Sequence, residues 1–361
     1  MSDRLFVATR KGLFTLHRRN GRWPVSEPQF LGDPVSAVLA DTRDGTLYAA
    51  LNLGHFGVKM RRSSDGGKTW TEHAVPEYPP QPGNAPGAPW KLDQIWVMEA
   101  AGADEPGAIW AGTNPGGLFV TRDRGESWSL VRTLWDRPER AEWSGGGYDT
   151  PGIHSICVDP RDSRTVSVGV STGGVWQTRD RGETWACRAS GMYAEYMPPD
   201  QRETPNAQDV HRMVACASAP DVMWVQHHNA MFRSTDRAAS WQEIEKPALA
   251  KFGFAVAVDP NDANTAWFVP AIKDELRVPV DGELAVTRTR DGGRTFEVLR
   301  EGLPPRPAYD LVYRHGLDVD ASGERLAMGS TTGGLWISEN RGDTWQCISA
   351  HLPQIYAVRF G

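Results

Sequence analysis

The 361-residue chain carries 39 lysine and arginine residues against 45 aspartate and glutamate residues, for a formal net charge of -6. This acidic balance argues against a broad basic surface, and we expect no nucleic-acid partner. The sequence contains no apolar run long enough to predict a membrane span. The start, MSDRLFVATRKG, lacks the apolar stretch and cleavage site of a secretory signal. We therefore expect a cytoplasmic protein with no membrane partner.

The first predicted elements, in residues 4–26, are three short β-strands. They read RLFVAT, GLFTLHR and RWPV, separated by turn residues. They match the second, third and fourth strands of a four-stranded unit whose first strand is missing. The missing strand is predicted at the other end of the chain, where IYAVRF begins at Ile355.

Between these ends, one eight-residue motif recurs. It contains Ser or Thr, then Asp, Gly, Ser or Thr and an aromatic residue, with one residue between each of the first four. Three copies deviate, with Ala238 for Gly, Phe296 for Trp and Asn340 for Asp. The third positions are 49 to 58 residues apart, at Asp65, Asp123, Asp180, Asp236, Asp291 and Asn340. A period of this length holds four short strands with their loops, which is typical of a propeller blade.

One repeat can be divided into strands directly. From His154 the chain reads HSICVDP, then TVSVGV, GVWQTR and TWACRA, which predict the innermost to the outermost strand. The motif is the turn before the outermost strand. Its Asp can accept hydrogen bonds from turn N–H groups and its Gly permits a positive φ, so a structural role explains it.

Together these elements predict an all-β fold, a seven-bladed β-propeller of four-stranded antiparallel blades. We expect one domain over residues 1–361. Its seventh blade is shared between about 4–26 and 353–361, so that pairing of the C-terminal strand with the N-terminal blade closes the ring and hides the sheet edges.

The six motifs resemble those of the Asp-box (BNR) propellers, which include sialidases, xyloglucanases, sortilin-type receptors and photosystem assembly factors. The resemblance spans the whole chain. A chain with this layout also resembles bacterial proteins labelled sialidase-like or glycosyl hydrolase-like. It implies the fold more strongly than an activity. The aromatic-Arg-Ile-Pro motif of sialidases is absent, because the corresponding hairpin reads ATRKGLF.

In a propeller, the loops entering the innermost strands and those joining the second and third strands emerge on one face, where ligand sites gather. Aligning the blades places six of the nine histidines there. We expect His154, His211 and His315 to bind one divalent metal ion, Zn, Mn or Fe, with His228 or His55 as a further candidate ligand and with no nucleotide cofactor. The alternative is a polar channel whose histidines bond to backbone and solvent.

Other residues on this face complete the predicted site. The candidate catalytic residues are Asp93, Asp310, His55 and His228, which would orient an imidazole or transfer a proton. Three long loops, at 74–93, 131–153 and 186–210, carry aromatic residues that could form a lid or merely pack the loops. The candidate substrate-binding residues are Arg10, Lys11, Asn114, Trp143, Tyr148 and Tyr193.

The sequence thus predicts a hydrolase or lyase acting on a small polar, carbohydrate-like substrate at a histidine-rich channel mouth. A glycosidase that uses a pair of carboxylates is one form of this hypothesis. The competing hypothesis is a non-catalytic propeller that binds a protein or small ligand through its aromatic loops.

Overall fold

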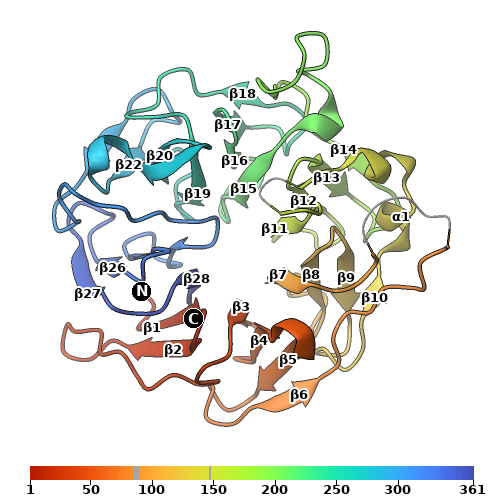
Figure 1. Cartoon of the computed structure of the whole chain (residues 1–361), viewed down its shortest axis with the longest axis horizontal. Helices are drawn as coiled ribbons and strands as arrows, with labels where there is room; N and C mark the ends of the chain where they lie inside the picture. The colour runs from red at the N-terminus through yellow and green to blue at the C-terminus, as the bar shows by residue number, and fades with distance from the viewer. Residues whose placement is uncertain (84–88, 146–147) are drawn as a thin grey trace. The chain divides into compact units, whose positions relative to one another are not determined.

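The computed structural model describes residues 1–83, 89–145 and 148–361 (Figure 1). Residues 84–88 and 146–147, which belong to two of the loops predicted as a lid, lie outside the described residues. The chain forms two compact units, residues 1–35, 189–203 and 210–361 in one, and residues 36–188 and 204–209 in the other. Within the described ranges, no helix has both the length and the apolar character needed to span a bilayer.

The unit with residues 36–188 contains three antiparallel sheets of four strands, each in chain order. In the middle sheet the strand β8 (Ile109–Asn114) is buried throughout, whereas the outermost strand β10 (Ser129–Leu130) is not. The strands are β3 (Val35–Ala40), β4 (Leu47–Asn52), β5 (Val58–Ser63) and β6 (Thr71–His73); β7 (Gln94–Ala100), β8 (Ile109–Asn114), β9 (Leu118–Thr121) and β10 (Ser129–Leu130); and β11 (Ile153–Val158), β12 (Val166–Val170), β13 (Gly174–Thr178) and β14 (Ala186–Cys187).

The other unit contains four sheets that follow one another in space as they do in the chain (Figure 1). A short strand, β21 (Leu276–Pro279), extends one of them by pairing with β20 (Ala266–Lys273). The remaining strands are β15 (Val210–Ala215), β16 (Met223–His227), β17 (Met231–Ser234) and β18 (Gln242–Glu243); β19 (Gly253–Val258), β20 (Ala266–Lys273), β22 (Val286–Thr289) and β23 (Glu297–Leu299); β24 (Leu317–Val319), β25 (Leu326–Gly329), β26 (Leu335–Ser338) and β27 (Gln346–Ser349); and β1 (Arg4–Thr9), β2 (Gly12–His17) and β28 (Ile355–Phe360).

These seven antiparallel sheets confirm the predicted seven-bladed β-propeller. Large side chains fill the space between neighbouring sheets of a unit; Trp110 and Trp176 belong to one apolar cluster and Trp267 and Trp336 to another. Burial of such rings on both faces explains why the inner strands read as nearly continuous apolar runs instead of alternating ones.

The predicted closing blade is confirmed. β28 pairs with β1 antiparallel, from Leu5 opposite Phe360 to Thr9 opposite Ile355. The predicted fourth strand, RWPV, is wrong as a continuous strand, because it forms only isolated bridges, including one between Leu16 and Val25. Pro24 and Pro28 lack the backbone N–H that a strand ladder needs, which explains the interruption.

The repeated motif forms the same hydrogen-bonded turn at all six positions. In the copy around Asp291, the carboxylate accepts the backbone N–H of Thr295 at 2.9 Å and its hydroxyl at 2.7 Å. The hydroxyl of Thr289 donates to the same carboxylate at 3.0 Å. In the copy with Asn340, the amide oxygen accepts the N–H of Thr344 at 2.9 Å. The carboxylate is therefore used to hold a turn.

These turns predict an acid-dependent loss of stability. The backbone N–H of Thr295, and then its hydroxyl, lower the pKa of Asp291 to about 2, and the hydroxyls of Ser127 and Thr121 lower that of Asp123 to about 2. A folded pKa below the unfolded value of about 3.9 stabilises the protein above pH 4, and this stabilisation is lost as the pH falls towards 2. The double variant D123N/D291N should lose part of this dependence.

The measurement is the urea midpoint between pH 5 and pH 2, on the wild type and the double variant. Asparagine fits the turn, as Asn340 demonstrates, so the double variant should fold. The exposed Asp200 offers the matched control, D200N, which should keep the wild-type pH dependence. An unchanged pH dependence in the double variant would contradict the argument.

Candidate functional site

The inner strands of four consecutive blades share an irregularity in register. The pairing shifts between Ile95 and Val97 in β7, between Ile153 and Ser155 in β11, between Val210 and Arg212 in β15, and between Gly253 and Val256 in β19. β-bulges re-aim side chains and are common beside active sites. The residues at these shifts include Trp96, His154, His211 and Phe254.

His154, in the unit with residues 36–188, lies in an aromatic setting. Its side chain is 0% exposed. Nδ1 is 3.0 Å from the hydroxyl of Ser155, and the ring meets the edge of Trp96 with 5.4 Å between centroids. Trp96 in turn contacts Tyr148, with 4.9 Å between ring centroids.

His211, in the other unit, is held on two sides. Its side chain is 2% exposed and stacks on Phe254, with centroids 4.4 Å apart and 14° between the planes. Nδ1 lies 2.6 Å from the backbone oxygen of Gly253. Because a carbonyl oxygen can only accept, Nδ1 carries the proton and a neutral ring keeps its lone pair on Nε2.

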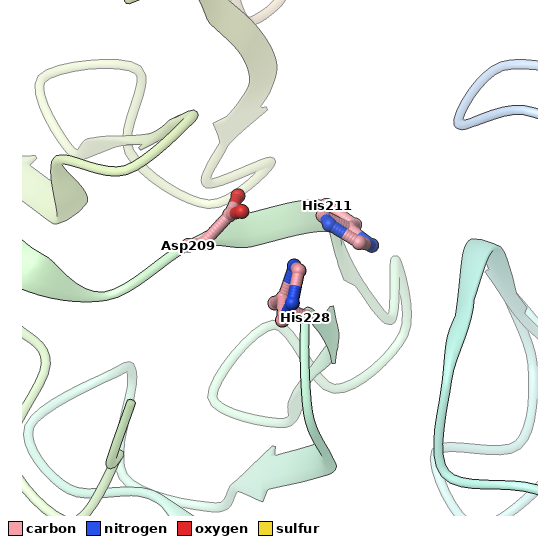
Figure 2. A group of neighbouring side chains, drawn as sticks. All are labelled: Asp209, His211 and His228. Carbon is pink, nitrogen blue, oxygen red and sulfur yellow. The ribbon is translucent and has the colours of Figure 1, made fainter. Parts of the chain in front are cut away.

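His228 lies close to His211, in the loop between β16 and β17. The two rings have centroids 5.4 Å apart. Asp209 lies only two residues before His211, so the short backbone segment between them keeps the two residues close together. One potential ligand atom from each of Asp209, His211 and His228 lies within 4.8 Å of the others. Figure 2 shows the His228 ring pointing towards β15, which carries His211 and which Asp209 directly precedes.

This group differs in composition from the predicted metal site. Among the residues that the structure describes, it contains His211 and His228, and neither His154 nor His315. His315 is half-buried, and its backbone oxygen accepts the N–H of Val358 at 2.9 Å. Metal binding by His154, His211 and His315 together stays a prediction.

Asp93 lies directly before β7, and its side chain reaches solvent. Its backbone N–H donates to the oxygen of Asn114 at 3.0 Å. Desolvation by the surrounding chain raises the pKa of Asp93, and the charge of Lys91 opposes this effect only in part. A carboxyl group with a raised pKa holds its proton closer to neutral pH, as a general acid requires.

Asp310 is half-buried and held by hydroxyl groups. Ser330 donates to its carboxylate at 2.8 Å, and Thr332 donates to the same oxygen. Two donors on one oxygen restrict the rotation of the carboxylate, so its orientation is fixed before any ligand arrives.

The other candidates divide into exposed and packed side chains. Tyr148 is 51% exposed. Tyr193 donates its hydroxyl to Glu243 at 2.9 Å, and Asn114 is buried and accepts the hydroxyl of Thr150. Trp143 is 6% exposed and packs on Trp176, so its ring lies in the core of its unit. The exposed candidates also include Arg10, Lys11 and His55.

Comparison with known proteins finds two curated relatives by sequence and a further likeness among solved structures. No model of a known protein family matches the chain. The "Oligoxyloglucan-reducing end-specific xyloglucanase" of Emericella nidulans is 37% identical over 287 residues, and the "Probable oligoxyloglucan-reducing end-specific xyloglucanase" of Neosartorya fischeri is 24% identical over 287 residues. These matches cover 70% and 71% of this chain but 32% of each fungal protein, so the chain spans about a third of their length.

A solved structure extends the likeness to almost the whole chain. The GH74 xyloglucanase from Xanthomonas campestris aligns with a TM-score of 0.66 and 17% identity, covering 97% of this chain and 53% of that one. The chain shares its fold with this GH74 enzyme.

The sequence did not lead us to Asp209 or to the aromatic residues Trp96 and Phe254. A signal for Asp209 existed, because Asp209 and His211 form an Asp-x-His pair in the sequence. The two aromatic residues had no signal of their own. Their register positions became evident only from the strand pairing.

Proposed function

We propose that the chain is a carbohydrate-acting hydrolase that cleaves glycosidic bonds in a xyloglucan-like or related glucan. The observation that carries this proposal is the 37% identity to a xyloglucanase over 70% of the chain. Local chemistry supports it. An exposed tyrosine, Tyr148, packs against Trp96 in the unit that also holds Asp93, and such aromatic faces suit flat, polyhydroxylated ligands.

Asp93 is the proposed general acid, because its pKa is raised. In such a reaction the acid gives its proton to the glycosidic oxygen as the bond from that oxygen to the anomeric carbon breaks. Water adds to the anomeric carbon, and a second carboxylate takes the proton that the water releases.

The test is a hydrolysis assay on a panel of xyloglucan oligosaccharides, cello-oligosaccharides and α-sialosides, with products separated by chromatography. We expect new reducing ends from the glucans. Release of sialic acid instead would favour a sialidase-like activity. Ligand-dependent thermal stabilisation without cleavage of any panel member would contradict the hydrolase and favour the non-catalytic binding propeller.

A further inference from the structure

We infer that Asp209, His211 and His228 bind one divalent metal ion of the class that prefers imidazole ligands, with Zn²⁺ first among them. The inference concerns a binding site and does not depend on the proposed hydrolase. Its starting point is the convergence of two imidazoles and one carboxylate, with one potential ligand atom from each within 4.8 Å of the others (Figure 2).

The composition of the group favours Zn²⁺ over Ca²⁺ or Mg²⁺. Ca²⁺ and Mg²⁺ are hard ions that take oxygen ligands, whereas imidazole suits Zn, Cu, Fe and Ni. Two histidines and one carboxylate form a known three-ligand set for zinc. Such a set leaves a fourth position open for water or a ligand oxygen.

His211 is already oriented as a metal ligand. Histidines that bind metals usually donate their other ring N–H to a carbonyl or carboxylate, which fixes the tautomer and the ring. The 2.6 Å bond from Nδ1 of His211 to the oxygen of Gly253 is of this kind and leaves the lone pair on Nε2. The stacked Phe254 ring further restricts the rotation of the imidazole.

Aromatic rings lie around the two histidines and make their immediate surroundings apolar. His228 meets the edges of Tyr196 and Phe252, with ring centroids 5.2 Å and 5.7 Å away. Phe252 also meets His211 at 5.6 Å. A hydrophobic shell limits solvent access around a metal site and strengthens the electrostatic attraction between a cation and its ligands.

The site must contract slightly to hold an ion. Ligand atoms that each lie about 2.0–2.2 Å from a tetrahedral zinc are roughly 3.4 Å apart, which is less than the 4.8 Å limit of this group. His228 is half-buried and lies in a loop, so its side chain can move towards the more firmly held His211. Metal binding should therefore also reduce the motion of the loop between β16 and β17.

The experiment uses the tag-free full chain, stripped with a chelator and titrated with Zn²⁺ by calorimetry. Metal content is measured by elemental analysis after dialysis. We expect one ion per chain and a rise in Tm with excess zinc. Substituting the loop imidazole, H228A, should weaken zinc binding more than roughly 100-fold, beyond the 10–100-fold typical of changes outside the ligand set. The near-isosteric D209N should also weaken binding.

Two other histidine variants serve as controls. His351 is exposed, and H351A should bind zinc as the wild type does. H315A tests the site predicted from sequence. Unchanged binding in H315A with loss in H228A supports the group in Figure 2, whereas the opposite pattern overturns it. If H228A does not fold, D209N decides the question, because unchanged zinc affinity in this variant overturns the inference.

The inference also fails if the wild type binds no zinc under these conditions. A second measurement checks the ligand type. Co²⁺ in place of Zn²⁺ should give a visible absorption band that disappears in H228A and persists in H351A. A band that persists in both variants would place the ion elsewhere.

Discussion

Replacing Asp93 with asparagine is expected to lower kcat for glucan hydrolysis by roughly 100-fold or more, because general acid catalysis contributes about 10²–10⁴-fold. Asparagine keeps the size of the side chain and cannot give up a proton. KM should change little if Asp93 acts mainly in the transition state. The activity of D93N should recover with aryl glycosides, whose leaving groups need no protonation.

The pH profile gives an independent readout of the same residue. A general acid works only while protonated, so activity should be present below the raised pKa of Asp93 and fall as the pH rises through it. This alkaline limb should disappear in D93N. The exposed neighbour of Tyr148 provides a control, D149N, which should keep the wild-type profile. Wild-type kcat in D93N on natural glucans would rule out its proposed role.

Burying a charge in the closing blade should have the largest effect on stability. Val358 is 3% exposed and belongs to an apolar cluster that includes Leu5 and Ile337. V358D would place an unpaired carboxylate there, at a cost of about 4 kcal/mol. V358A removes two methyl groups without adding charge and should cost about 2 kcal/mol. The two variants separate loss of packing from burial of charge.

Thermal unfolding and urea midpoints at neutral pH measure both variants. The test compares the loss of stability in V358D with the loss in V358A, because V358A changes the packing of the same cluster without adding a charge. Equal losses in V358A and V358D would mean that the carboxylate reaches solvent. In that case β28 would not be held in the closing blade as tightly as its burial indicates.

The sequence predicted the propeller because the strongest signals are local. Each motif closes a turn through hydrogen bonds among residues no more than four apart, such as those between Thr289, Asp291 and Thr295. The repeat length then sets the number of strands per blade, and the unmatched strands at the two ends complete the last one. The interruption at Pro24 could also have been predicted, because proline has no backbone N–H to donate to a strand ladder.

The candidate site was harder to predict because equivalence between blades is not proximity. Aligning repeats identified His154 and His211 as equivalent positions, which the shared register shifts bear out. It could not establish which side chains meet. His211 meets His228 of its own blade, and the pairing of Val210 with His227 explains why the two histidines are neighbours. Strand pairing within one blade brings these two histidines together, and an alignment between blades does not reveal such a contact.

The pairing of β28 with β1 also constrains the order in which the protein can mature. On the ribosome, β1 must wait for β28 to be synthesised, since Leu5 pairs with Phe360. Until β28 has been synthesised, the edge of β1 that pairs with β28 has no permanent neighbour, and such an edge can recruit strands from other nascent chains. Slow or truncated synthesis should therefore favour aggregation before it affects any finished molecule.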